Sequence, residues 1–423
     1  MFDDMIYAPF EGILPHKVFA NLVVALPYDV LSFYEAKELA KDNPYSFLHI
    51  SKAEIDFEDK IDVYDEKVYL KASENFRGLL TNAVLHNVGK PCFYVYKMQE
   101  KGKNAQIGIV VAASVKAYLE GRIKRHELTR IVKEDDRVKQ IKEVGAQTGP
   151  ALLINKNIDK VKEKLKNIVQ KEALFEVEDV NKVKHSLWLV DDDEDIKFLA
   201  EEFNKQNKAY IADGHHRSAA AARIAKEENM VDEARFLAVA FFEDEMKILD
   251  YNRVVYDLNG LSKEEFLNKL NAYFKVVKKD FAKPCQKGEF AMYLDKEWYV
   301  LNYMGNVEGY DAVAKLDVSI LSSKVLDEIL GIKDLRNSLR IEFIGGIRGQ
   351  KEIMEKTDRT GGVGFMLYPT KISELLEVAD NDMLMPPKST WFEPKLLDGM
   401  VSYPMSDKKR NLINDKKRNL KCA

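Results

Sequence analysis

Hydrophobic and polar positions alternate with two different periods along the chain, so they predict a mixture of helices and strands. Near the start, residues 64–80 have the apolar spacing of a helix, whereas residues 92–96 and 106–113 are short apolar runs typical of strands. Ser32 and Glu35 have the spacing of a capping box at the start of a further helix. This part of the chain is predicted to form one α+β region.

The middle of the chain carries more charge and again mixes the two patterns. Residues 151–154 are apolar and predict a strand. Residues 156–178 are rich in lysine and glutamate and predict a helical region that faces solvent. Residues 187–190 predict another strand, and a helix is expected to begin near Ile196.

Beyond about residue 255, helical segments at 263–273 and 319–330 are interspersed with strands at 289–294 and 298–303. The glycine-rich segment 361–364 is followed by an apolar run and not by a helix, so it predicts a turn into a strand and not a phosphate loop. The patterns predict an α+β (mixed α/β) fold. Its predicted regions are an N-terminal α+β region (1–120), a core (121–250), a C-terminal α+β region (251–404) and a disordered polar tail (405–423).

The most informative stretch is a predicted strand, turn and helix start near the middle of the chain. Residues 210–212 are apolar and predict a buried strand, and the alanine-rich residues 218–225 predict a helix. Asp213 and Gly214 are predicted to make the turn between them. The first turn of the helix therefore carries two histidines and an arginine.

The composition of this first helical turn, His215, His216 and Arg217, predicts a binding site for an anion such as phosphate. A helix start presents unpaired backbone N–H groups and the positive end of the helix dipole. Arg217 adds a two-pronged hydrogen-bond donor. The alternative is that Asp213 only caps the helix, as aspartate often does without a ligand. Capping does not account for three potential cations placed beside a positive dipole end, where they repel one another.

Composition narrows the class of protein. A chain of 423 residues predicts two or three domains, and a formal net charge of -4 disfavours a general nucleic-acid binder. The three cysteines, Cys92, Cys285 and Cys422, are scattered and odd in number, which favours a reducing compartment. The N-terminus lacks the pattern of a secretory signal, and no apolar run approaches the length of a membrane span. We expect a cytoplasmic protein.

A second candidate for chemistry is His126-Glu127, which lies among several lysines and arginines. Arg130 stands where a zinc protease motif needs its second histidine, so that class is excluded. A carboxylate among cations can act as a base near bound phosphate, and the alternative is a surface cluster of salt bridges. Phosphoryl transfer needs an N–H cradle, a cation such as Mg²⁺ and a carboxylate. Residues 214–218 can supply the cradle, and Glu127 the carboxylate if the fold brings them together.

Seven short blocks in this order are typical of a known family. They are Pro27-Tyr-Asp-Val30, Asn43-Pro-Tyr-Ser46, His126-Glu-Leu-Thr-Arg130, Lys133-Glu-Asp-Asp-Arg137, Thr148-Gly-Pro150, Asp213-Gly-His-His-Arg217 and Met385-Pro-Pro-Lys-Ser-Thr390. From about residue 8 to about residue 402 the chain resembles the family called domain of unknown function ten-fifteen. Its Asp-Gly-His-His-Arg segment is similar to that of the ADP-dependent free serine kinase family (SerK), whose core is ParB/sulfiredoxin-like.

The resemblance implies roles for individual residues of this chain. Glu127 would be the catalytic acid or base, with His126 beside it. Asp213 would orient the loop or bind a Mg²⁺ ion. The resemblance places the nucleotide phosphates on Gly214, His215, His216, Arg217 and Ser218. It also implies a ParB/sulfiredoxin-like fold for the core predicted at 121–250, with ADP or ATP as co-substrate.

The resemblance further implies phosphoryl transfer between phosphoserine or serine and a nucleotide, in the service of serine biosynthesis. Phosphoserine and ADP would give serine and ATP, or the kinase reaction would run the other way. Two alternatives remain open: a phosphoserine phosphatase that needs no nucleotide, and a ParB-like, nucleotide-dependent DNA-binding regulator. The expected partners are small molecules, with neither nucleic acid nor membrane, and the sequence leaves the oligomeric state open.

Further polar residues are candidates for binding the substrate. They are Arg130, Arg137, Thr148, Arg253, Lys388, Ser389 and Thr390, with Lys395 nearby in the sequence. Family members often carry His-Arg near residue 252, where this chain has Asn252-Arg253. A role for that histidine therefore does not carry over, while Arg253 remains a candidate for contact with an anion.

Overall fold

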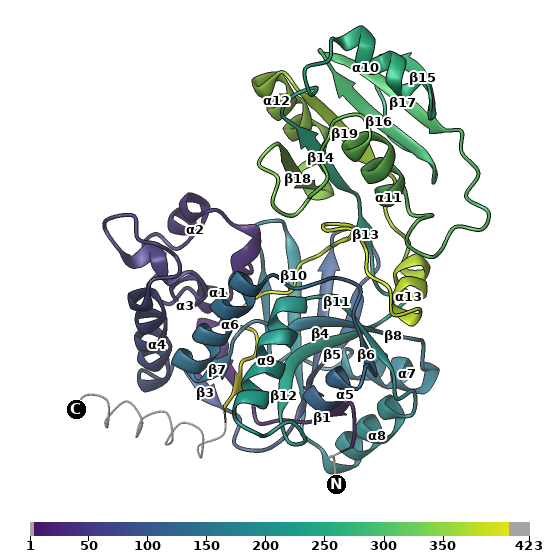
Figure 1. Ribbon diagram of the computed structural model, residues 1–423. Helices are drawn as coiled ribbons and strands as arrows, with labels where there is room; N and C mark the ends of the chain where they lie inside the picture. Colours follow the sequence, from purple (N-terminus) through teal and green to yellow (C-terminus); the bar gives the residue numbers. More distant parts are fainter. Residues whose placement is uncertain (1–3, 406–423) are drawn as a thin grey trace. The chain divides into compact units, whose positions relative to one another are not determined.

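The computed structural model describes residues 4–405 of the chain, which fold into two compact units (Figure 1). Unit 1 is formed by the described residues of 1–124, 129–246 and 394–423. Unit 2 is formed by residues 125–128 and 247–393. The regions predicted at 1–120 and 121–250 both contribute to unit 1, and the predicted polar tail lies outside the described residues from residue 406 on.

Unit 1 is built on a mixed sheet in which β1 (Tyr7–Ala8) pairs with β5 at the side of the main path. Two neighbouring pairs are parallel, β6 with β11 and β8 with β12, and the other pairs are antiparallel. The path runs β6 (Ile123–Lys124), β11 (Ala209–Asp213), β8 (Ala151–Asn155), β12 (Arg235–Phe242), β5 (Gln106–Ser114), β4 (Phe93–Glu100), β10 (Val183–Val190) and β9 (Phe175–Glu178). Unit 1 also contains two separate antiparallel strand pairs. They are β2 (Ile13–Pro15) with β3 (Leu85–Asn87) and β7 (Ala146–Gln147) with β21 (Tyr403–Pro404).

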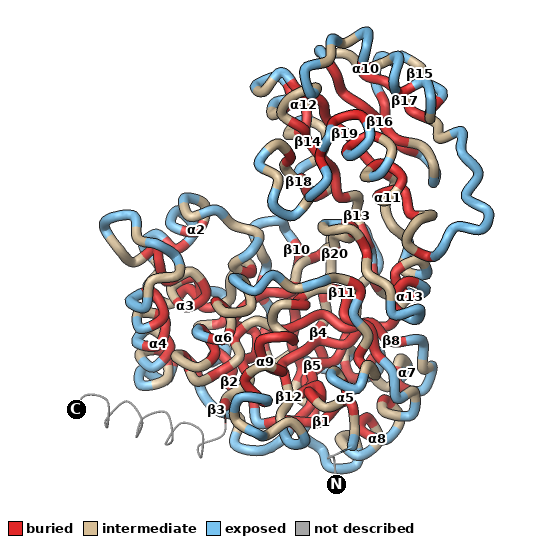
Figure 2. The backbone as a smooth tube through the Cα atoms, in the orientation of Figure 1, coloured by how far each residue is buried: buried red, intermediate tan, exposed pale blue. Residues whose placement is uncertain are grey.

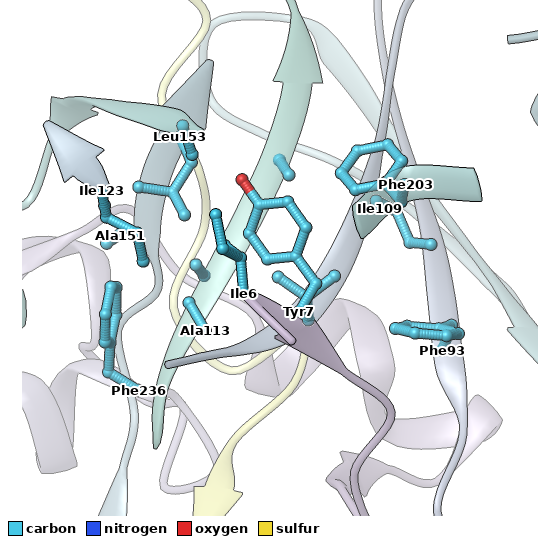
Figure 3. Close-up of a cluster of buried hydrophobic side chains, with 14 of the residues drawn as sticks. Ile6, Tyr7, Phe93, Ile109, Ala113, Ile123, Ala151, Leu153, Phe203 and Phe236 are labelled. Carbon is cyan, nitrogen blue, oxygen red and sulfur yellow. The ribbon is translucent and has the colours of Figure 1, made fainter. Parts of the chain in front are cut away.

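The main core of unit 1 consists of side chains from these strands and from the helices that pack on them (Figure 3). This core combines aromatic residues such as Phe93, Phe203 and Phe236 with alanines and aliphatic residues. The ring of Tyr7 lies within this core, and its hydroxyl donates to Asn155 Oδ1 at 2.9 Å. A hydrogen bond of this kind removes the cost of burying both polar groups.

Helices of unit 1 bring several of the sequence blocks together. Helix α6 (Ile131–Val144) contacts both α4 (Glu66–Thr81) and α9 (His215–Glu227). Small residues such as Ala220 let α9 lie close to Ile141 of α6. The remaining helices of this unit are α1 (Ala20–Val23), α2 (Phe33–Leu39), α3 (Leu48–Ser51), α5 (Val115–Leu119), α7 (Asp159–Ile168) and α8 (Asp193–Asn204).

Unit 2 contains a second sheet, which is antiparallel throughout. Its order is β15 (Phe274–Lys279), β17 (Glu297–Tyr303), β16 (Glu289–Leu294), β19 (Val363–Leu367), β14 (Tyr251–Val255) and β18 (Ile341–Gly345). Its helices are α10 (Lys263–Leu270), α11 (Asp317–Leu321), α12 (Gly349–Thr360) and α13 (Ile372–Asp380), and a short pair joins β13 (Ile248–Leu249) to β20 (Trp391–Phe392). In both units the buried residues concentrate in the sheet strands, as Figure 2 shows.

The predicted α+β class is confirmed, with a large mixed sheet and thirteen α-helices among the described residues. The capping box of Ser32 and Glu35 is present at the start of α2. Gly361 ends α12 in the left-handed conformation and the chain turns into β19, as predicted. Within the described part of the chain, none of the helices combines the length and apolar character that crossing a bilayer requires.

Two predicted helical segments are wrong in part. The region at 156–178 is helical only in α7, and its end forms β9, where alternate side chains are buried and the backbone pairs with β10. The predicted helix at 319–330 becomes α11 followed by a π-helical stretch over residues 322–327. In the first case pairing along the sheet outweighs the helix propensity of a charged sequence.

The close approach of α6 and α9 gives a test of the packing. Ala220 is fully buried, so Ala220→Leu adds volume that this contact cannot accept. We expect it to lower the free energy of unfolding by about 1–3 kcal/mol, measured by urea denaturation. Lys226→Leu on the exposed side of the same helix is the control. Equal stability of the two variants would show that α9 does not pack as described.

Candidate functional site

The start of α9 is shaped by one glycine. Gly214 has φ of 88°, in the left-handed region, and separates β11 from α9. A Cβ atom at this position would lie 2.9 Å from Ala151 Cα, so a larger residue does not fit. The pairing of β11 with β8 shifts register just before the turn, between Ile211 and Asp213. Glycine is therefore required both by the backbone conformation and by the neighbouring strand.

Asp213 does not cap α9, so the alternative interpretation from the sequence is wrong. It is the last residue of β11, its Oδ1 accepts the backbone N–H of Gly214 at 2.7 Å, and the N-cap is Gly214 itself. Because the N-cap residue has no side chain, it offers no acceptor to the N–H groups of the first turn. The helix start therefore keeps the backbone arrangement that binds anions.

The other oxygen of Asp213 is also engaged. Its Oδ2 accepts from Lys395 Nζ at 3.2 Å. Burial would raise the pKa of Asp213, but the charges of Lys395 and Arg217 lower that pKa below its usual value. Since protein donors bind both oxygens, these contacts favour the predicted role in orienting the loop over the predicted role as a Mg²⁺ ligand.

The two histidines and the serine of this segment differ in their surroundings. His216 Nε2 accepts the backbone N–H of Arg130 at 3.0 Å, which ties the 129–130 segment to α9 and leaves the proton of a neutral ring on Nδ1. The side chain of His215 is buried. Ser218 is also buried, and its hydroxyl donates to the carbonyl of Gly214 at 3.3 Å. The hydroxyl of Ser218 is thus engaged within the helix itself.

Arg217 reaches from α9 toward residues of two other sequence blocks. Its Nη1 donates to the carbonyl oxygen of Pro150, and its Nη2 lies 3.5 Å from Asp29 Oδ2. The guanidinium carbon is 6.0 Å from the centroid of the Tyr28 ring. Burial opposes the charge, but the carboxylates of Asp29 and Asp213 raise the pKa of Arg217 well above its usual value. The residue is therefore a permanent cation at this site.

Arg137 joins the same cluster from α6. Its guanidinium carbon lies 4.0 Å from the centroid of the Tyr28 ring, and its Nη2 donates to Asp136 Oδ2 at 2.7 Å. Asp136 Oδ1 also accepts from the hydroxyl of Tyr69 at 2.9 Å. Burial disfavours the charge of Arg137, yet the neighbouring Tyr28 and Asp136 raise its pKa. Two arginines thus converge on one aromatic ring.

A small cavity of about 30 Å³ lies among these residues. Asp398, which is only 2% exposed, lines it from the C-terminal segment of unit 1. Burial raises the pKa of Asp398 to about 7, although the charge of Arg217 acts in the opposite direction. The cavity is lined by Tyr28, Ser51, Arg137, Gln140, Ile141, Gln147, Thr148, Gly149, Arg217 and Asp398.

Unit 1 therefore brings together some of the predicted site residues and adds others. Arg137, Thr148 and Arg217 meet at the cavity, and Asp213 and Lys395 form an ion pair within the same unit. Sequence reasoning did not single out Tyr28, Asp29, Gly149 or Asp398 as site residues. For the first three, the blocks Pro27-Tyr-Asp-Val30 and Thr148-Gly-Pro150 were a usable signal, whereas Asp398 lies in none of the seven blocks.

Other predicted residues lie in unit 2. His126 is buried, and its carbonyl oxygen accepts the backbone N–H of Met385 at 2.8 Å, so the His-Glu segment is tied to the loop that contains Lys388, Ser389 and Thr390. Glu127, next to it, is half-buried.

Arg253 lies on β14 in the same unit. It is buried, donates from Nη2 to the carbonyl oxygen of Lys388 at 3.0 Å, and has its guanidinium carbon 5.4 Å from the ring centroid of Phe343. Burial lowers its pKa to about 10. Ser389 Oγ donates to the carbonyl oxygen of Pro386 at 2.6 Å. These bonds hold the loop in place on the sheet of unit 2.

The raised pKa of Asp398 predicts how stability changes with pH. An aspartate in an unfolded chain ionises near pH 4, whereas folded Asp398 ionises near pH 7. Between these values the folded state retains a proton that the unfolded state has lost, so the free energy of unfolding falls as pH rises from about 4 to about 7. We expect Asp398→Asn to remove up to about 4 kcal/mol of this fall, measured by urea denaturation across that range. Parallel pH profiles for both proteins would contradict the raised pKa of the buried Asp398 carboxyl group.

Comparison with known proteins gives matches of two kinds. Among solved structures, a variant of free serine kinase in complex with ADP is similar, with 16% identity and a TM-score of 0.35, covering 72% of this chain and 94% of that chain. SbnI with C-terminal truncation, from Staphylococcus aureus, has 11% identity and a TM-score of 0.40, covering 74% and 97%. A conserved hypothetical protein from Pyrococcus furiosus has 16% identity and a TM-score of 0.32, covering 66% and 90%.

A search among curated protein sequences finds no match. The family described as "Protein of unknown function (DUF1015)", the same domain of unknown function ten-fifteen, matches residues 7–319. This range includes the blocks around Tyr28, Glu127, Arg137, Thr148 and Gly214, four of which supply the contacts of the unit 1 site. The chain therefore belongs to the DUF1015 family.

Proposed function

We propose that this protein is a phosphotransferase that moves a phosphoryl group between serine or phosphoserine and a nucleotide, on a ParB/sulfiredoxin-like core. In one direction phosphoserine and ADP give serine and ATP, and in the other serine is phosphorylated. The observation that carries the proposal is the start of α9, where Gly214 leaves the N-cap without a side chain and Arg217 supplies a permanent cation.

The start of α9 has the properties that phosphate binding requires. Backbone N–H groups and the positive helix end attract a phosphate, and the fixed backbone of Gly214 holds them in place before the ligand arrives. Arg217 stabilises the negative charge that is shared among the phosphoryl oxygens during transfer. The proposal assigns this charge stabilisation to Arg217 and the helix start, because Asp213 already binds Lys395 and Gly214.

Chain connectivity supports Glu127 as the acid or base. Arg130 is bound through its backbone N–H to His216 on α9. Glu127 is three residues before Arg130, so its Cα lies within roughly 11 Å of the Cα of Arg130. This limit is compatible with a carboxylate that acts at a phosphate bound by α9.

The proposed step moves one proton and one phosphoryl group. When serine is phosphorylated, its hydroxyl oxygen forms a bond to the terminal phosphorus of the nucleotide as the bond to the nucleotide oxygen breaks. Glu127 accepts the proton of that hydroxyl. When phosphoserine is the donor, the nucleotide oxygen attacks phosphorus, and Glu127 returns the proton to the departing serine oxygen.

The direct test measures products from phosphoserine with and without ADP. ATP and serine formed together support phosphotransfer, whereas phosphate released without nucleotide supports the hydrolytic alternative. Salt-dependent binding to duplex DNA with neither product would support the regulatory alternative. A protein that shows no turnover and no DNA binding would contradict the proposal and its alternatives.

Replacement of Glu127 tests the proton transfer. Glu127→Gln keeps the size of the side chain but cannot accept a proton, so we expect kcat to fall by about 10²–10⁴-fold with little change in nucleotide affinity. The control is Glu163→Gln on the exposed side of α7. Full activity of the Glu127 variant would move the acid or base to another residue, with Asp135 and Asp136 as the next candidates.

Replacement of Arg217 tests the phosphate site. Arg217→Ala should raise the Kd for nucleotide about 10- to 100-fold, because the positive charge beside the helix start is lost. Arg223→Ala is a matched control, since it removes an arginine of the same helix that pairs with Asp135 and Glu227. Calorimetric titration gives the Kd, and thermal unfolding checks that both variants are folded. Equal Kd values for the two variants would exclude Arg217 as a phosphate ligand.

A further inference from the structure

One buried carboxylate oxygen of unit 1 lacks a partner among the described residues. Asp398 is 2% exposed, and its Oδ1 accepts no hydrogen bond within the described chain. Its backbone is fixed by two hydrogen bonds with Ala25, of 2.9 and 3.1 Å, which hold this residue beside the cavity. An unsatisfied buried carboxylate is costly, which makes this oxygen a candidate for binding a ligand.

The charges around Asp398 identify the type of ligand. Three cations of this cluster already have carboxylate partners: Arg137 with Asp136, Arg217 with Asp29, and Lys395 with Asp213. Asp398 is a fourth carboxyl group, and no lysine, arginine or histidine between residues 4 and 405 forms an ion pair with it. When Asp398 is ionised, the cluster is therefore short of one positive charge. A cationic hydrogen-bond donor would supply that charge and would also donate a hydrogen bond to Asp398 Oδ1.

The size of the cavity limits the ligand group. A volume of about 30 Å³ exceeds the roughly 10–15 Å³ that one water molecule needs, so the cavity has room for a small group such as an ammonium. Gly149 keeps the space open, because a Cβ atom there would lie 3.0 Å from Asp398 Oδ1. Arg217 lines the cavity and also belongs to the first turn of α9, so the cavity adjoins the predicted phosphate site.

We propose that Asp398 and the cavity beside Gly149 bind the α-ammonium group of an amino-acid substrate. This inference rests on the proposed function. The ammonium site would select amino acids as the substrates of that reaction. The enzyme recognises an amino acid through its ammonium group while the side-chain oxygen of the same molecule lies toward α9. A hydroxy acid or a substrate without the amine leaves Asp398 unsatisfied and is rejected.

The test compares phosphoserine with its analogue that lacks the amine, 3-phosphooxypropanoate. The wild-type protein should prefer phosphoserine in kcat/KM and in calorimetric affinity by about 10- to 100-fold. Asp398→Asn keeps the shape but removes the charge, and Gly149→Ala crowds Oδ1, so each should reduce this preference at least about tenfold. Asp59→Asn, at an exposed position of unit 1, is the control and should retain the wild-type preference. Circular dichroism checks folding, and Gly149→Ala carries the test alone if Asp398→Asn does not fold.

The outcomes separate this inference from the proposed function. An unchanged preference in both variants, with phosphotransfer intact, would overturn the ammonium site and leave the reaction standing. Binding of serine that Asp398→Asn abolishes, in a protein that turns over no phosphoserine, would retain the site and exclude the reaction. A wild-type protein that binds neither serine nor phosphoserine would overturn both.

Discussion

The left-handed backbone of Gly214 is the constraint on which the rest of the site depends. It ends β11, starts α9 and passes so close to Ala151 that no side chain fits. This junction fixes where the helix dipole points and where the first-turn residues lie. Arg217 then reaches the 148–150 loop and Asp29 because α9 begins at this place. A different turn would separate these groups even if every other element formed.

Around this junction, charged side chains are arranged in pairs, and the pair of Arg137 and Asp136 is the most buried. Asp213 pairs with Lys395, Arg217 with Asp29 and Arg137 with Asp136. Breaking such a pair leaves an uncompensated charge, so pairs of this kind hold loops from distant parts of the chain together. Asp398 departs from this pattern, because it forms no ion pair among the described residues and its Oδ1 accepts no hydrogen bond from them. Stability and binding are therefore linked through the same set of side chains.

The seven sequence blocks have different structural roles. The Tyr28 and Arg137 blocks and the Thr148 block meet the helix start in unit 1. Met385 binds the backbone of His126 within unit 2, and Arg253 binds Lys388 there. Arg130 joins these two sets along the chain, because the segment leaves unit 2 after Leu128 and its next residues are bound to α9. The order of the blocks along the sequence thus does not correspond to their grouping in space.

The sequence by itself determined the α+β class, several of the central strands, the capping box at Ser32 and the strand–turn–helix start at Gly214, because each depends on local periodicity, capping or glycine chemistry. It predicted Arg217 as a site residue from its chemistry, and it named Arg137 and Thr148 as candidates within the sequence blocks. Only the tertiary structure decided that residues 175–178 form a strand, since pairing with β10 outweighs local propensity. It alone placed Tyr28, Gly149 and Asp398 around one cavity. The burial of a single loop residue and its contacts with distant residues produce no periodic pattern in the sequence. The sequence therefore does not distinguish Asp398 from an exposed aspartate.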